Sequence, residues 1–322
     1  MAETDCPALS VVVAIVSDTA GRPDTRHLAQ CLAALTRQRG APGMEIIVPH
    51  LPGMAGIAAL CEEYPNVRFI EAQGLRTHTG RSGSREHHDE LRARGLALAR
   101  GNIIALIEDH GIPAPDWSAY IDATLRPPFV AVGGAIENGV DRPLNWAVYF
   151  CDFLRYQNPV PAGESAFASD ANIAYRRAAL ESIRPVWQES FYEPAVNEAL
   201  RSRGEIVALA PDVVLYQHRQ GLRFGFALKE RFVWGRSYAA LRGKLAPRRR
   251  LLWALFSPAL PVLLLARMTA MAWKKRRTLA PFLKALPLTS VLLITWAMGE
   301  LAGYVTGQPA RRGSAATADS AR

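Results

Sequence analysis

The sequence predicts an α/β protein with a mainly parallel sheet, followed by C-terminal hydrophobic helices that associate with a membrane. Three observations support this prediction. Strand-like and helix-like segments alternate over residues 9–136, at the spacing of β-α-β units. The first strand-like segment is continuous and rich in β-branched residues, as a strand buried on both faces should be. Residues 251–307 are far more apolar than the rest of the 322-residue chain.

The alternating part of the chain provides the sheet. We expect strands at residues 9–16, 44–48, 67–71, 102–107 and 129–136. Helices are expected between them at residues 26–38, 54–63 and 85–100. The first helix is the clearest, because Leu28, Cys31 and Leu35 fall on one helical face. Right-handed crossovers then place ligands beyond the carboxyl ends of the strands.

The pattern over residues 140–220 is less regular. Residues 144–156 are rich in aromatic side chains, and residues 178–183 look helical. A further helix is expected at residues 196–203, where Gly204 stops it as a C-terminal glycine does. Residues 207–216 predict a strand, or a pair of strands broken at Pro211.

The end of the fourth predicted strand carries the most informative group of side chains. The apolar run from Ile103 to Ile107 stops at Glu108-Asp109-His110, and a proline-rich turn follows. Two carboxylates and an imidazole at the carboxyl end of a strand can hold a divalent cation against a diphosphate. The alternative is that these three residues form only a polar turn before the next helix.

Five further pieces of sequence accompany this group. They are the helical residues 26–32, the strand residues 45–48, the segment Ala93–Gly101 before the fourth strand, the segment Pro113–Trp117 and the segment Asp170–Arg177. Their order and spacing over residues 9–220 resemble the catalytic domain of inverting family 2 glycosyltransferases. The resemblance implies a GT-A fold (Rossmann-like, with a mainly parallel sheet), a nucleotide-sugar donor and a Mn²⁺ or Mg²⁺ cofactor.

The same resemblance implies a set of metal ligands. Asp109 and His110 would hold Mg²⁺ or Mn²⁺ on the diphosphate of the nucleotide-sugar, with Glu108 beside them. His218 matches a histidine often found in the family and is a further candidate metal ligand. A cation would neutralise the charge that develops on the leaving diphosphate. Imidazole in place of a carboxylate favours Mn²⁺ somewhat over Mg²⁺.

The nucleotide contacts depart from the family pattern. After Val48 the family usually has two aspartates that hold the nucleotide, whereas this chain continues with Pro49-His50. His50 is therefore a candidate nucleotide contact, and a loop histidine is the alternative. Ser17 and Asp18, beside the first strand, offer replacement contacts. Arg92 falls on the family's basic position before the metal-binding strand and is also expected to bind the nucleotide-sugar, as are Glu108 and Asp109.

The catalytic base should be a carboxylate, because an inverting transfer needs a group that takes the proton of the acceptor hydroxyl. In the family the base lies shortly before a helix that ends in Arg-x-x-Gly, and counting back from Gly204 places Glu193 there. The usual pair of acids is reduced here to one. Glu198, on the helix, is the second candidate. The alternative role for Glu193 is capping of the helix that begins near Pro194.

The net charge of +9 is concentrated before the apolar end of the chain. Residues 222–250 interleave basic and aromatic side chains and contain a single acid, Glu230. Such a segment indicates an in-plane contact with an anionic membrane surface. Nucleic acid is not expected as a partner, because no helix-turn-helix, zinc-finger or RNP pattern is present. The four scattered cysteines indicate a reducing compartment.

Two apolar stretches close the chain, at residues 251–273 and 279–305. Each is long enough to span a bilayer. Two ordinary crossings would place Lys274–Arg277 outside, against the positive-inside tendency. A re-entrant or in-plane arrangement would keep both basic clusters at the cytoplasmic face of the cell (inner) membrane. We therefore expect association with that face and leave open whether the chain crosses. The alternative is a pair of soluble core helices.

These observations combine into one organisation and one leading function. We expect a GT-A domain at residues 1–221, a basic amphipathic interfacial segment at 222–250, membrane-associated helices at 251–307 and a disordered tail at 308–322. The expected activity is metal-dependent transfer of a sugar, with inversion, to a lipid-linked or membrane-near acceptor. A degenerate GT-A domain that binds a nucleotide-sugar or a partner without turnover is the alternative. A nucleotidyltransferase is disfavoured, because no glycine-rich phosphate loop follows the first strand.

Overall fold

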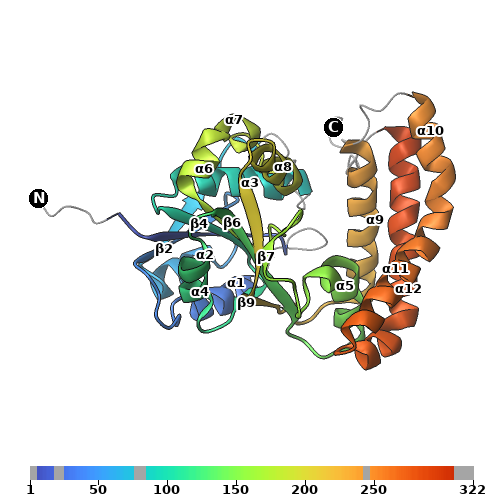
Figure 1. Ribbon diagram of the computed structural model, residues 1–322, viewed down its shortest axis with the longest axis horizontal. Helices are drawn as coiled ribbons and strands as arrows, with labels where there is room; N and C mark the ends of the chain where they lie inside the picture. The colour runs from blue at the N-terminus through green and yellow to red at the C-terminus, as the bar shows by residue number, and fades with distance from the viewer. Residues whose placement is uncertain (1–5, 18–24, 76–84, 242–246, 308–322) are drawn as a thin grey trace, which may run out of the picture.

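A computed structural model describes residues 6–17, 25–75, 85–241 and 247–307 of the chain. The tail that was expected to be disordered, residues 308–322, lies outside these ranges. In Figure 1 a sheet with helices on both faces occupies one side of the molecule. A bundle of long helices from the C-terminal third stands beside it.

The described residues form one sheet of nine strands. In chain order these are β1 (Leu9–Ala14), β2 (Met44–His50), β3 (Val67–Glu71), β4 (Ile103–Glu108), β5 (Gly111–Pro113), β6 (Phe129–Asn138), β7 (Gly163–Glu164), β8 (Asn172–Arg176) and β9 (Ile206–Gln217). Across the sheet the order is β3-β2-β1-β4-β8-β6-β9-β5, with β7 paired to β9.

The strand directions confirm the predicted α/β class. The first four strands of the sheet, β3-β2-β1-β4, are parallel. β8 then runs antiparallel to β4 and β6, and β6 and β9 are again parallel. In the pairing of β1 with β4, Ala14 lies opposite Glu108. The residues that follow β1 therefore lie beside the Glu108-Asp109-His110 group.

Helices cover both faces of the sheet because its central strands are apolar on both sides. One face is covered by α1 (Thr25–Leu35), α2 (Ile57–Glu63) and α4 (Trp117–Thr124). The other face is covered by α3 (Arg85–Leu98), α6 (Arg177–Ser182), α7 (Arg184–Trp187) and α8 (Glu193–Arg201). In β1, Val11 and Val13 belong to the first core and Val12 to the second. This double burial explains the unbroken apolar run in the sequence.

β9 is one strand, although Pro211 lies inside it. Its pairing with β6 passes from Gly134–Ala210 to Ala135–Val214, so residues 211–213 form a bulge. Proline is tolerated in a strand at such a bulge because no ladder hydrogen bond is lost. A Cβ on Gly134 would lie 2.0 Å from the carbonyl oxygen of Val213, so the bulge requires glycine there. Of the two alternatives for this segment, the single strand is therefore correct.

The remaining helices form the bundle. They are α5 (Pro143–Phe153), α9 (Phe224–Leu241), α10 (Pro247–Phe256), α11 (Leu260–Lys275) and α12 (Leu279–Thr306). α9 and α12 lie side by side in Figure 1 and approach closely at glycines. A Cβ on Gly235 would lie 2.3 Å from the carbonyl oxygen of Trp296, and one on Gly299 would lie 2.3 Å from that of Phe232. The segment that was expected to be an in-plane helix thus contributes a helix that packs along α12.

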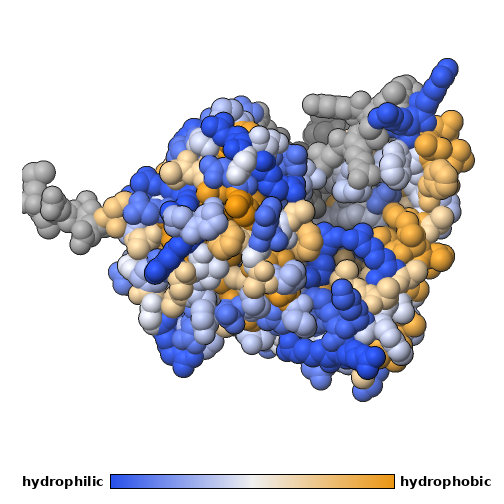
Figure 2. Space-filling view, viewed as in Figure 1, coloured by the Kyte–Doolittle hydropathy of each residue, from blue (hydrophilic) through white to orange (hydrophobic). Residues whose placement is uncertain are grey.

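The outer side of the bundle exposes large apolar side chains. Figure 2 shows them gathered along the edge of the molecule formed by α10 and α11. They include Leu251, Leu255, Phe256, Val262 and Leu263, which are 60–73% exposed. Two segments, Arg248–Lys275 and Leu279–Thr306, are long and apolar enough to cross a membrane. Only 11% and 28% of their most apolar windows are buried, unlike the core helix of a soluble protein.

Candidate active site

A cavity of about 240 Å³ lies where the carboxyl end of β4 meets the bundle. Four residues predicted from the sequence line it, namely Arg92, Glu108, His110 and Glu193. Ligand sites of α/β sheets are expected beyond the carboxyl ends of parallel strands, and this cavity occupies that position. Polar side chains not predicted as site residues also line it, including Asn145, Asp152, Asp170 and Arg219.

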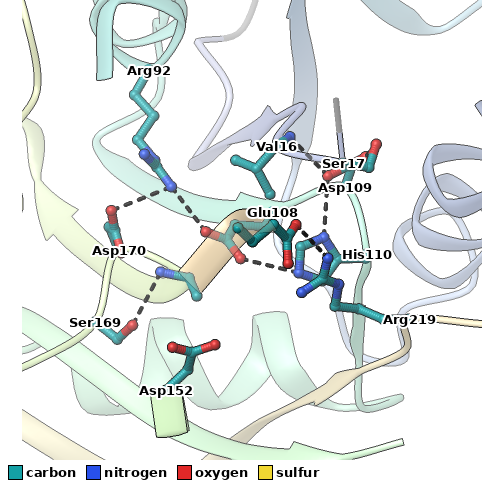
Figure 3. A network of polar contacts seen from close by, with 12 residues as sticks. Val16, Ser17, Arg92, Glu108, Asp109, His110, Asp152, Ser169, Asp170 and Arg219 are labelled. Carbon is teal, nitrogen blue, oxygen red and sulfur yellow. Dashed lines mark hydrogen bonds and ion pairs between the residues drawn. The ribbon is translucent and has the colours of Figure 1, made fainter. Parts of the chain in front are cut away.

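The Glu108-Asp109-His110 group forms one network of polar contacts, in which His110 lies between the two carboxylates (Figure 3). Glu108 and His110 line the cavity, with Oε2 of the carboxylate 3.4 Å from Nε2 of the imidazole. Asp109 is fully buried, and its carboxylate accepts hydrogen bonds from the Val16 amide at 3.0 Å and from the Ser17 hydroxyl. Asp109 therefore joins the end of β4 to the chain that follows β1. Asp109 and His110 form the turn that follows β4, and Oδ1 of Asp109 lies 3.4 Å from Nδ1 of His110.

The two carboxylates of this group have opposite pKa shifts. Burial raises the pKa of Glu108 above its usual value, and His110 and Arg92 only partly oppose this effect. Burial would also raise the pKa of Asp109, but interactions with His110, Ser17 and Val16 hold it below its usual value. Its surroundings thus favour the ionised form of Asp109. A cation placed beside Glu108 would stabilise the ionised form of that carboxylate.

Arg92 is the cation nearest to Glu108. It is 3% exposed, and its guanidinium lies 3.0 Å from carboxylate oxygens of both Asp89 and Glu108 and 3.3 Å from one of Asp170. Burial would lower the pKa of Arg92, but these three carboxylates raise it above its usual value. Its Nε has no hydrogen-bond partner among the described residues. Arg92 therefore holds together carboxylates from α3, β4 and the segment before β8.

The structure separates the two candidates for the catalytic base. Glu193 is the first residue of α8 and lines the cavity, and Asn197 donates a hydrogen bond to its Oε1. The side chain of Glu198 is 67% exposed and pairs with Arg201 at 2.6 Å. Glu198 is not among the residues that line the cavity. Only Glu193 is thus brought to the same cavity as Glu108 and His110.

Among the other predicted residues, Ser17, His50 and His218 do not line the cavity. Ser17 contacts Asp109, and Asp18 lies outside the described residues. His50 ends β2, and its Nδ1 lies 2.9 Å from the Leu51 carbonyl oxygen. The amide of His218 donates to the carbonyl of His110 at 2.8 Å, but its ring lies 3.1 Å from Oε1 of Gln30 on α1.

Of the three predicted metal ligands, Asp109 and His110 lie together, with 3.4 Å between Oδ1 and Nδ1, and His218 lies apart from them. His218 turns toward α1, while Asp109 is engaged with Val16 and Ser17. Within the described ranges, no group of three His, Cys, Asp or Glu side chains is arranged to hold a metal ion. The pair that shares the cavity is Glu108 and His110. Nδ1 of His110 lies 3.4 Å from Oδ1 of Asp109 and makes no shorter hydrogen bond with a described residue.

Two ion pairs that the sequence did not predict tie the bundle to the cavity. Arg219, which follows β9, pairs with Glu230 of α9 at 2.6 Å. Arg231 of α9 makes two hydrogen bonds to Asp152 of α5, one of 2.6 Å. Asp152 and Arg231 are 79 residues apart, so no local pattern could pair them. The sequence held one sign of the other pair, because Glu230 is the single acid in the basic segment 222–250.

Comparisons with known proteins identify the fold. No protein-family model and no curated protein matches the sequence. The mannosyltransferase PcManGT from Pyrobaculum calidifontis, solved in complex with GDP-Man and Mn²⁺, matches with a TM-score of 0.51 and 18% identity over 92% of this chain and 88% of that chain. S. aureus TarS 1–349 matches with a TM-score of 0.45 and 15% identity over 94% and 93% of the two chains. The first similarity confirms the predicted GT-A domain with apolar C-terminal helices.

Proposed function

We propose that this protein is a metal-dependent glycosyltransferase that moves a sugar, with inversion, from a nucleotide-sugar to a lipid-linked or membrane-near acceptor. One observation carries the proposal. Glu108, His110 and Glu193 line a single cavity at the carboxyl end of β4 in a GT-A domain. The similar mannosyltransferase was solved with a nucleotide-sugar and Mn²⁺, which supports the same classes of donor and cofactor here.

The cavity residues fit a divalent cation that is shared with the donor. Mg²⁺ is usually held by one or two carboxylates together with substrate phosphates, so a full set of protein ligands is not required. Carboxylate and imidazole also suit Mn²⁺. Glu108 and His110 would be the protein ligands, because both line the cavity and their Oε2 and Nε2 atoms lie 3.4 Å apart. The cation would neutralise charge on the departing nucleoside diphosphate.

The remaining residues are assigned by position. Glu193 is the proposed base, and its hydrogen bond from Asn197 fixes where the carboxylate points. Asp109 supports the cavity from behind through Val16 and Ser17. Arg92 keeps Glu108 and Asp170 close together despite their like charges. Direct nucleotide contacts by Ser17, Asp18 and His50 stay predictions.

Membrane association is proposed from the apolar outer face of α10 and α11. The basic turn between α11 and α12 lies against the GT-A domain, where Arg277 pairs with Glu137 at 2.7 Å and Lys275 donates to the Gln157 carbonyl. This contact keeps the turn on the side of the GT-A domain, which favours an in-plane or re-entrant arrangement over two crossings. The expected location is the cytoplasmic face of the cell membrane.

Nucleotide-sugar turnover tests the proposed activity. Purified full-length protein would be incubated with Mn²⁺ and a panel of nucleotide-sugars, and released nucleoside diphosphate would be measured. We expect release with at least one donor, and its loss in Glu193→Gln. Donor binding that depends on Mn²⁺ but yields no release with any donor or membrane extract would instead support the degenerate binding domain. No binding of any donor would contradict both.

A further inference from the structure

A second cavity, of about 700 Å³, lies within the helical bundle. Its volume falls in the range of small-molecule sites. Apolar side chains from α10, α11 and α12 form most of its wall, including Trp253, Phe256, Leu260, Leu263, Leu264 and Leu293. The bundle would bury more apolar surface if this space were filled, so the cavity is suited to an apolar ligand.

The second cavity adjoins the candidate active site. Asp152 of α5 and Trp296 of α12 line both cavities. A ligand in the bundle could therefore present one end to the cavity that contains Glu193 and Glu108. Because the donor is expected at the end of β4, the ligand of the adjoining cavity would be the acceptor.

The wall of the cavity and the space beside it offer hydrogen-bond donors that lack partners among the described residues. Arg231 is 2% exposed and lines the cavity, and its Nε has no partner among the described residues. Arg267, which is exposed, lines the same cavity and makes no ion pair with another described residue. The indole N–H of Trp234, in the adjoining cavity, is also buried and without a described partner. Buried donors of this kind call for an oxygen-rich, anionic group.

The two acids of the cavity both have hydrogen-bond partners within the protein. Asp152 is already matched by Arg231. Glu300 accepts a hydrogen bond from Nε1 of Trp296 at 2.5 Å. Arg267 makes no ion pair with a described residue, so an anionic group on an occupant would find a positive partner there.

The outer end of the cavity opens on the apolar face of the bundle. Phe256 and Leu263 line the cavity and are also 60% and 66% exposed. Figure 2 shows that the surrounding surface of α10 and α11 is hydrophobic. A hydrocarbon chain could therefore pass from a bilayer into the cavity without crossing a polar surface.

We propose that this cavity binds the acceptor, and that the acceptor is a membrane lipid with a long hydrocarbon chain and a phosphate headgroup. The chain occupies the space between α10, α11 and α12, and the headgroup lies near Arg231 and Arg267. This inference rests on the proposed function, because it assigns the acceptor of the same reaction.

Photo-crosslinking tests the proposal without any donor. Full-length protein in detergent would be exposed to a diazirine-bearing hexadecyl phosphate, and the labelled peptides would be identified by mass spectrometry. We expect labelling of α10, α11 and α12 at the cavity wall. Leu263→Trp should fill the cavity and reduce labelling about tenfold. Val262→Trp is the matched control, because Val262 is 73% exposed and does not line the cavity.

Competition with unlabelled ligands tests the headgroup. Hexadecyl phosphate should compete about tenfold more strongly than hexadecanol, because a charge-assisted hydrogen bond is lost with the phosphate. Arg267→Gln should remove most of this difference, whereas the control Arg248→Gln, on α10 outside the cavity, should retain it.

The outcomes separate this inference from the proposed function. Equal labelling of wild type, Leu263→Trp and Val262→Trp would overturn the cavity assignment, as would equal competition by the alcohol and the phosphate. Sugar transfer to a water-soluble acceptor without any cavity labelling would overturn the lipid acceptor and leave the glycosyltransferase standing. Specific labelling in a protein that binds no nucleotide-sugar would support the lipid site and contradict the proposed function.

Discussion

Glu108 and His110 face one another across the cavity wall, with 3.4 Å between Oε2 of the carboxylate and Nε2 of the imidazole. Asp109 lies between them in sequence, with its Oδ1 3.4 Å from Nδ1 of His110, and it accepts hydrogen bonds from Val16 and Ser17. The three consecutive residues therefore have two tasks. Glu108 and His110 are placed to meet a ligand, and Asp109 is placed to join two strand ends.

Replacing Asp109 with alanine should destabilise the protein. The buried amide of Val16 would lose the hydrogen bond that it donates to the Asp109 carboxylate. Loss of such a partner lowers the free energy of unfolding by about 1–3 kcal/mol. We expect the thermal unfolding midpoint to fall by several degrees. Glu181→Ala is the control, because it removes only an exposed ion pair with Arg184 and should change the midpoint little. Equal midpoints for the two variants would contradict the supporting role of Asp109.

Replacing Glu193 with glutamine should slow sugar transfer without weakening donor binding. Loss of a general base typically reduces the rate by about 10²- to 10⁴-fold. The matched change, Glu198→Gln, affects an exposed side chain that pairs with Arg201 outside the cavity. It should leave the rate nearly unchanged. If Glu198→Gln were the slower enzyme, the assignment of the base would be reversed.

Replacing Gly299 with alanine should loosen the contact between α9 and α12. The added Cβ would lie 2.3 Å from the Phe232 carbonyl oxygen, so the helices must separate. Overpacking of this kind costs about 1–3 kcal/mol, and the thermal midpoint should fall. Gly225→Ala is the control on α9, because a Cβ added there would have no atom within 4 Å. A midpoint for Gly299→Ala at or above that of the control would argue against the close packing.

Charged residues on the outer face of the bundle should release the protein from membranes. Leu255 and Val262 are 70% and 73% exposed, and burying a side chain of this size in lipid is worth about 1.5–3 kcal/mol. The double change Leu255→Glu with Val262→Glu should move protein from the membrane pellet to the supernatant after cell fractionation. Glutamates at Tyr120 and Val186, which are exposed on the GT-A domain, are the control. An unchanged pellet fraction would contradict lipid contact by this face.

Much of the sheet was predictable because its strands are buried on both faces. The run from Leu9 to Val16 and the run from Ile103 to Ile107 are apolar with almost no interruption, which only a doubly covered strand requires. The short strand β5 and helix α4 were not among the predicted elements. β5 has three residues, too few to show a period. The bulge at Pro211 depends on Gly134, which lies in a different strand.

The site was only partly predictable for a related reason. Glu108, His110 and Glu193 stand out in the sequence because Glu108 ends β4, His110 follows it and Glu193 begins α8. The pairing of Asp152 with Arg231 depends on how α5 and α9 pack, and a linear pattern carries no sign of it. The orientation of the His218 side chain could not be predicted either. The backbone of His218 lies beside His110, as expected, but its ring points to Gln30.

Binding of nucleoside diphosphates with and without Mn²⁺ tests the central claim most directly. Calorimetric titration of the wild-type protein with GDP, UDP, ADP and CDP should show one nucleotide that binds at least about tenfold more tightly with Mn²⁺ than with a chelator. His110→Ala should abolish this dependence, and His218→Ala, whose ring faces Gln30, should keep it. Binding of every nucleotide that is equally tight with the chelator, or Mn²⁺ dependence that survives in His110→Ala, would contradict a cation held by Glu108 and His110.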